Sequence, residues 1–140
     1  TTGALRRLDW ALSGGAEILV VALGGNDGLR GLPVDQMKKN LSQIIMVAKA
    51  RGIKVLLAGM EAPPNFGEVY TTAFREVFRQ LAREHDVAWV PFLLEGVAGV
   101  PNLNQPDGIH PTAEGATRIA KHVWPAVERL VQQMTIGDGQ

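Results

Sequence analysis

The sequence predicts an α/β fold with a parallel sheet. Short apolar runs that favour strands alternate with longer stretches in which apolar residues recur at helical spacing. The strand-like runs are continuous rather than alternating, which is typical of strands buried on both faces of a parallel sheet. Regular alternation of strand and helix indicates that crossover helices connect the strands.

Length and composition limit the classes of protein to which the chain can belong. It has 140 residues, no cysteine and a formal net charge of zero. This length suits one α/β domain, which we expect over residues 1–134, with 135–140 as a tail. A nucleic-acid surface needs a clustered excess of Lys and Arg, and a membrane span needs a longer apolar run. The sequence therefore predicts neither, and disulfides and cysteine metal sites are excluded.

The first half of the chain contains two strand-and-helix units. A short helix is expected over 4–12, followed by a strand over 18–23 that is buried on both faces and ends at two glycines. A loop should cover 26–33. Residues 34–51 have the apolar stripe of a helix, with Gly52 at the position of a C-terminal cap. A second buried strand is predicted over 54–60.

The second half repeats the pattern and closes on a long helix. After a loop over 61–65, a helix is expected to reach Glu84, and a short strand to cover 87–90. Residues 91–106 are irregular but apolar. The last helix should begin near Pro111, because a proline in the first turn has no N–H that needs a partner. Pro125 lies inside this helix, where a proline can introduce a kink.

Asp107 and His110 stand three residues apart just before the last helix. A catalytic histidine needs a carboxylate on its far nitrogen, and a short loop of this kind can supply both groups. The alternative is an ordinary polar turn, since Asp-Gly favours turns. A metal site formed with Asp27 is a further, weaker alternative, because no other ligand is evident. The pair is therefore a candidate for acid–base chemistry.

Asn26 follows the first buried strand in a glycine-rich turn. Parallel sheets bind ligands at the carboxyl ends of their strands, which places Asn26 on the same edge as Asp107 and His110. An amide N–H₂ group there could donate a hydrogen bond to an oxyanion. Gly-Asn-Asp is also a common turn sequence, and Asp27 could simply cap local backbone N–H groups.

The two motifs together resemble the SGNH, or GDSL-type, hydrolases. Residues 24–27 (Gly-Gly-Asn-Asp) and 107–111 (Asp-Gly-Ile-His-Pro) carry the resemblance, which points to the bacterial arylesterase, thioesterase and lysophospholipase branch. It implies a flavodoxin-like three-layer α/β/α sandwich, ester or thioester hydrolysis without a cofactor or metal, and a periplasmic or secreted location. It also implies His110 as general base, Asp107 as its orienting acid and Asn26 as oxyanion donor.

Several loop residues are expected to contact an acyl ester or thioester substrate. An arginine at this edge could meet an anionic head group, and leucines could line an acyl chain, although such residues are also common in solvated or packed loops. The predicted substrate contacts are Gly25, Leu29, Arg30, Pro64 and Leu103.

The main difference between this sequence and the family concerns the nucleophilic serine. The family's serine lies in a Gly-Asp-Ser motif after the first strand, whereas Ser13 precedes the first strand of this chain and Ser42 lies in a helix. We expect the serine and the first two strands of the sandwich in a separate N-terminal segment that pairs with the open edge of strand 18–23. A second copy of the chain could cover that edge instead. The alternative function is then a catalytically inactive dimerising or structural module.

Overall fold

The structure, a computed structural model, describes the backbone of residues 1–137 and the side chains of residues 1–135. The chain divides after Pro91 into two compact units. Residues 1–91, the sheet unit, contain every strand of the described chain, and the residues that follow, the helix unit, contain a long loop and the last helix. Each unit is described by itself.

The sheet unit is built on three parallel strands in the order β1-β2-β3. They are β1 (Ile18–Val21), β2 (Lys54–Ala58) and β3 (Ala88–Val90). Ile18 is in register with Lys54, and Leu56 with Ala88. The predicted parallel α/β class is confirmed. Among the described residues no strand pairs with the outer edge of β1.

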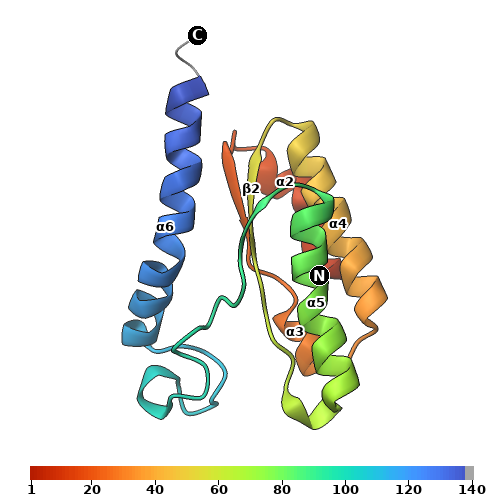
Figure 1. The fold of residues 1–140 in the computed structure, drawn as a ribbon, viewed down its shortest axis with the longest axis vertical. Helices are drawn as coiled ribbons and strands as arrows, with labels where there is room; N and C mark the ends of the chain where they lie inside the picture. The colour runs from red at the N-terminus through yellow and green to blue at the C-terminus, as the bar shows by residue number, and fades with distance from the viewer. Residues whose placement is uncertain (138–140) are drawn as a thin grey trace. The chain divides into compact units, whose positions relative to one another are not determined.

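Helices α4 (Val34–Ala50) and α5 (Glu68–Glu84) run side by side against the sheet (Figure 1). Their apolar stripes form most of the core, as the helical spacing predicts. Helix α4 ends at Ala50 and is followed by Arg51 and Gly52. Gly52 has the positive φ of 73° expected of a C-terminal cap. The fully buried core side chains include Met37, Leu41, Ile44, Ile45, Leu57, Phe74, Phe78 and Leu81.

Two details of the first half differ from the sequence prediction. The expected helix over 4–12 is two short helices, α1 (Thr2–Arg6) and α2 (Leu8–Leu12), because Arg7 leaves the helical conformation. The strand over 18–23 is not buried on both faces, since Val20 is 42% exposed. Side chains alternate along a strand, so Leu19 and Val21 pack on the core while Val20 faces the opposite way.

The segment after β1 was expected to be a loop, but it contains the short helix α3 (Gly25–Leu29). The turn into it is made by Gly24, whose φ of 109° is in the left-handed region. A Cβ atom there would also press against Phe78 and Met37, at 3.1 and 3.2 Å. Gly24 therefore allows the chain to leave β1 sharply and place Asn26 and Asp27 in the first turn of α3.

The helix unit begins at Phe92, within the irregular segment predicted over 91–106, and this segment contains the 3₁₀ turn η2 (Pro101–Leu103). Another 3₁₀ turn, η1 (Pro64–Phe66), lies in the sheet unit. The last helix, α6 (Ala113–Gly137), starts two residues after Pro111 and continues through Pro125. Residues 135–137 of the expected tail are thus helical, and 138–140 lie outside the described residues. In the described part of the chain, no helix has the length and hydropathy of a membrane span.

Candidate functional site

Asp107 and His110 lie in a loop whose two ends are fastened to each other. An antiparallel bridge joins Asn104 to Pro111, and the Thr112 N–H donates to the Leu103 carbonyl at 2.9 Å. The Gln105 N–H donates to the His110 carbonyl at 2.7 Å. Gly115, in the first turn of α6, approaches Leu103 so closely that a Cβ would overlap its carbonyl oxygen. The loop is therefore a closed, hydrogen-bonded structure although it is exposed.

The carboxylate of Asp107 holds both the ring and the backbone of His110. Its Oδ2 lies 2.7 Å from His110 Nδ1. Its Oδ1 accepts hydrogen bonds from the N–H groups of Ile109 and His110, at 2.9 and 3.0 Å. The His110 side-chain bond, followed by these backbone bonds, lowers the pKa of Asp107 from 3.8 to about 2. Asp107 is therefore ionised at neutral pH, and its charge favours the Nδ1–H tautomer of His110.

The other ring nitrogen of His110, Nε2, has no hydrogen-bond partner among the described residues. The His110 side chain is 69% exposed, so this nitrogen can reach a substrate or a second side chain. A neutral imidazole whose Nδ1–H is held by a carboxylate can accept a proton at Nε2. The geometry thus suits general-base chemistry, as the spacing of the two residues predicts.

Asn26 is an exposed residue of α3 in the sheet unit. It lines a cavity of about 370 Å³ together with Thr1, Thr2, Arg7 and Arg30. No hydrogen bond engages its side-chain amide within residues 1–135. Both hydrogens of the amide are therefore available to a ligand in this cavity.

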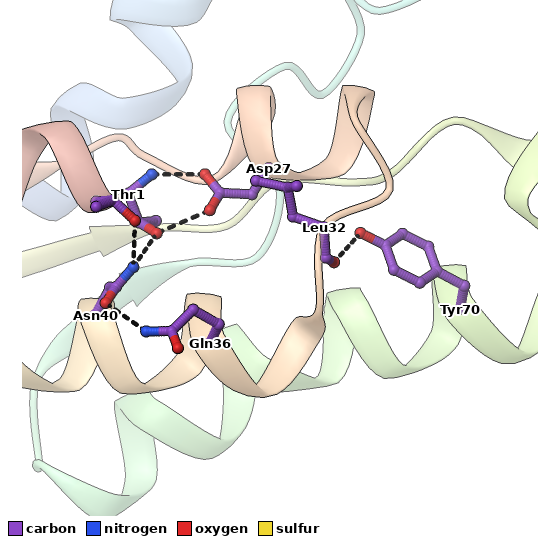
Figure 2. Close-up of polar contacts among 7 residues, drawn as sticks. Thr1, Asp27, Leu32, Gln36, Asn40 and Tyr70 are labelled. Atoms are coloured by element: carbon purple, nitrogen blue, oxygen red, sulfur yellow. Dashed lines mark hydrogen bonds and ion pairs between the residues drawn. The ribbon is translucent and has the colours of Figure 1, made fainter.

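The neighbouring Asp27 is buried, with 5% of its surface exposed (Figure 2). Its Oδ1 accepts a hydrogen bond from Thr1 Oγ1 at 2.8 Å, and the Thr1 nitrogen lies 2.6 Å from its Oδ2. The amide of Asn40, on α4, donates to Thr1 Oγ1 at 2.9 Å and to Thr2 Oγ1 at 3.1 Å. Asp27 thus bonds to Thr1, 26 positions away in sequence, rather than to local backbone N–H groups.

The end of the α3 segment is fastened separately. Tyr70, on α5, donates a hydrogen bond from its hydroxyl to the Leu32 carbonyl at 2.7 Å (Figure 2). Burial, and then the charge of Asp27, raises the pKa of Tyr70, which keeps the hydroxyl protonated as a donor. The α3 segment is therefore linked to α4 through Thr1 and to α5 through Leu32.

The predicted substrate contacts are not gathered in one place. Arg30 lines the same cavity as Asn26, whereas Gly25 and Leu29 belong to α3 but are not among its lining residues. Pro64 lines a different cavity of about 300 Å³ in the sheet unit, together with Arg75. Leu103 is fully buried in the helix unit.

Sequence reasoning missed a cavity of about 430 Å³ beside the Asp107 loop, to which Asn104, Gln105, Pro106 and Gly108 contribute. It also missed Asn40, for which a signal existed. Asn40 is the one polar residue on the buried stripe of α4, between Met37 and Leu41. A buried polar residue is normally hydrogen-bonded, so this position could have been recognised as part of a polar cluster.

Neither serine lines the Asn26 cavity of the sheet unit. Ser13 ends α2 before β1 begins, and its hydroxyl donates to the Trp10 carbonyl at 2.7 Å. Ser42 Oγ lies 2.8 Å from His85 Nε2, near the start of β3. Ser13 is thus at the amino end of β1, whereas Asn26 follows its carboxyl end, and Ser42 lies in the middle of α4. Within the described residues, no carboxylate bonds to His85, and no group of three or more acidic or histidine residues could hold a metal ion.

Comparison with known proteins gives relatives over most of the chain. The sequence model of the GDSL-like Lipase/Acylhydrolase family matches residues 1–118. Esterase TesA of Pseudomonas aeruginosa is 44% identical over 94% of this chain and 66% of its own length. The Escherichia coli K12 protein named thioesterase 1/protease 1/lysophospholipase L1 is 39% identical over 81% of this chain and 54% of its own.

Solved structures give the same result. The crystal structure of TesA superimposes with a TM-score of 0.87 at 43% identity, covering 92% of this chain and 72% of that one. The psychrotrophic esterase EstA from Pseudoalteromonas, inhibited by monoethylphosphonate, gives 0.86 at 30% identity, with coverages of 93% and 72%. The chain spans between half and two thirds of the length of its curated relatives. On these matches, the chain belongs to the GDSL-like lipase/acylhydrolase family, as its two motifs predict.

Proposed function

We propose that the chain is the portion of a serine-type ester hydrolase that supplies the general base, its orienting acid and one oxyanion donor. The observation that carries this proposal is the Asp107–His110 pair, with its 2.7 Å contact to Nδ1 and a free, exposed Nε2. Family membership supports the reaction class, since the printed names of its relatives include esterase and thioesterase. The substrate is an acyl ester or thioester.

The proposed reaction proceeds through an acyl-enzyme. His110 Nε2 takes the proton of a serine hydroxyl as the oxygen attacks the acyl carbonyl, and then gives that proton to the leaving alcohol or thiol. In the second half, His110 takes a proton from water, which attacks the acyl-enzyme and releases the acid. Asp107 remains ionised throughout and stabilises the imidazolium, consistent with its low pKa.

Asn26 is the proposed oxyanion donor. Its amide faces a cavity large enough for a small substrate group and is not occupied by another described residue. A donor that is already free and fixed in place needs no reorganisation when the carbonyl oxygen becomes negative. The substrate oxygen therefore accepts a hydrogen bond from this amide as it becomes negative.

We place the nucleophile in a segment outside this sequence. Ser13 donates to the Trp10 carbonyl before β1 begins, Ser42 contacts His85, and neither serine lines the Asn26 cavity. A nucleophile must lie within hydrogen-bonding reach of its base and beside the oxyanion donor. Such a segment would also supply a strand for the free edge of β1. A second copy of the chain at that edge is the alternative, and would leave the chain without a nucleophile.

Arg30 is the proposed contact for an anionic part of the substrate. It shares the Asn26 cavity with Arg7, and neither arginine forms an ion pair within the described residues. Two unpaired guanidinium groups favour a carboxylate or phosphate. Leu29, Gly25, Pro64 and Leu103 have weaker support, because none of them lines this cavity.

The test is hydrolysis of short acyl esters by the whole protein that contains this chain, with His110→Ala compared against His122→Ala. Loss of the base should lower kcat by several orders of magnitude. His122 is the matched control, because it lies in the same unit but bonds only to the Phe92 carbonyl through Nε2, at 2.9 Å.

The His122→Ala protein should keep its activity. Equal activity of the two variants would remove His110 from the mechanism. Absence of hydrolysis by the unaltered protein would favour the inactive structural module.

A further inference from the structure

We propose that Asp27, Thr1 and Asn40 are positioning residues that fix the direction of the Asn26 amide. This inference rests on the proposed role of Asn26 as oxyanion donor. It assigns a function to a buried polar network to which the proposed mechanism gives no role.

The network is a continuous chain of hydrogen bonds from α4 to α3. Gln36 Nε2 donates to Asn40 Oδ1 at 3.0 Å, Asn40 Nδ2 donates to Thr1 Oγ1 at 2.9 Å, and Thr1 Oγ1 donates to Asp27 Oδ1 at 2.8 Å (Figure 2). Every donor points towards the carboxylate. Hydrogen bonds aligned in this way polarise and strengthen one another.

Burial gives the network its rigidity. Asp27 and Asn40 have only 5% and 6% of their surface exposed, and no buried side-chain polar atom lacks a partner in residues 1–135. A buried carboxylate is costly unless it is hydrogen-bonded, so Asp27 has no low-energy alternative to its bonds with Thr1. Rotation of α3 would break those bonds.

Asn26 is coupled to this network through the backbone of a very short helix. It precedes Asp27 directly in α3, which has five residues and no side-chain cap at its N-terminus. A helix of this length is not stable by itself, so its orientation must come from tertiary contacts. Asp27 provides one such contact. Gly28 provides another, because it packs so closely against the ring of Phe74 that an added Cβ atom would lie 3.0 Å from the ring.

The network also borders the place where Asn26 would act. Thr1 and Asp27 line the same 370 Å³ cavity as Asn26, whereas Asn40 and Gln36 lie behind them and are not among its lining residues. Asn40 therefore does not face this cavity, and a change at Asn40 reaches the reaction only through the residues it holds. This separation makes Asn40 the informative position for substitution.

The test is a double-mutant cycle between Asn40→Ala and Asn26→Ala in the whole protein. Alone, Asn40→Ala should lower kcat by about ten- to a hundredfold with KM within about twofold, because a small misplacement of a catalytic group has effects of this size. In the Asn26→Ala background it should change kcat by less than about twofold. The matched control is Gln43→Ala, an exposed amide on the same helix, which should leave kcat unchanged.

A purely structural network would give a different result. Asn40→Ala would then lower thermal stability equally in the unaltered and Asn26→Ala backgrounds. Its effect on kcat would be the same in both backgrounds, or there would be no effect on kcat in either. Either result for kcat would overturn the proposal. If Asn40→Ala does not fold, Thr1 provides a second pair of variants. Thr1→Val removes the central hydroxyl of the network, and Thr1→Ser keeps it. Only Thr1→Val should show a loss of kcat that depends on Asn26.

A measurement without substrate separates this inference from the proposed function. In ¹⁵N NMR spectra, the side-chain amide of Asn26, assigned by its loss in Asn26→Ala, should be ordered in the unaltered protein and become averaged in Asn40→Ala. An Asn26 amide that is equally ordered in both proteins would refute positioning, even if the protein hydrolyses no ester.

Discussion

Asp27 and Asp107 are held in opposite ways. Asp27 is 5% exposed and bonds to Thr1, which is 26 positions away in sequence. Asp107 is exposed and bonds to Ile109 and His110, two and three positions away. The buried carboxylate connects elements of the fold, whereas the exposed one organises a single loop and a histidine. Burial therefore separates a carboxylate that connects distant parts of the fold from one that orients a histidine within a loop. The free ring nitrogen of that histidine is where we propose that the chemistry occurs.

The largest expected effect separates the two aspartates by activity. Asp107→Asn should lower kcat roughly 10³- to 10⁴-fold, because the charge that fixes and stabilises the His110 ring is lost. Its free energy of unfolding should change little, since the side chain is exposed. Ester hydrolysis and urea denaturation of the whole protein measure the two quantities. An unfolded Asp107→Asn protein would show that this loop stabilises the fold.

The second effect tests the residue next to Asp27. Asn26→Ala should lower kcat about a hundred- to a thousandfold, the range for one oxyanion donor, with little change in KM. The amide is not used by another described residue, so its removal leaves no buried group without a partner. Steady-state kinetics with a short acyl ester distinguish the roles. Loss of affinity with unchanged kcat would mean that Asn26 binds the substrate ground state.

Whether the hydrogen-bond partners of each aspartate could be predicted depends on how far apart the partners lie in the sequence. Asp107 and His110 lie in one loop, and their spacing made the contact that the structure shows a candidate from the sequence, beside the alternative of a polar turn. The described partner of Asp27 is Thr1, at the start of the chain, and Thr1 in turn accepts a hydrogen bond from Asn40 of α4. No periodicity relates these positions. Long-range side-chain contacts of this kind leave no local pattern in a single sequence.

The same reasoning explains which elements of the fold were predicted. The strands and the helices α4 and α5 have apolar runs or stripes long enough to be recognised, and each was found at nearly the predicted bounds. Helix α3 was missed because Gly, Asn and Asp all favour turns and five residues cannot show a stripe. The exposure of Val20 was missed because a continuous apolar run does not reveal which face of a strand is covered.

The third effect separates the two aspartates by stability. Asp27→Ala should lower the free energy of unfolding by about 1–3 kcal/mol, because the Thr1 hydroxyl and nitrogen lose their acceptor inside the unit. Asp9→Ala is the matched control: Asp9 forms an ion pair with Arg51, but its side chain is 87% exposed. That variant should change stability by less than about 0.5 kcal/mol. Equal effects in urea denaturation would contradict the importance of burial.

The smallest effect concerns the charge of Asp107. Its pKa is about 2 in the folded protein, compared with an ordinary value of 3.8, so its carboxylate stabilises the folded loop above about pH 4 and loses this effect as the pH falls towards 2. The hydrogen bond from the His110 ring is the main cause, and the N–H groups of Ile109 and His110 come next. In His110→Ala the pKa should therefore rise but stay below 3.8, because both backbone donors remain. A ¹³C NMR titration of the Asp107 carboxyl group in the two proteins measures this difference. An unchanged midpoint would mean that the backbone bonds alone hold the carboxylate, and that Asp107 and the His110 ring are not coupled as the 2.7 Å contact indicates.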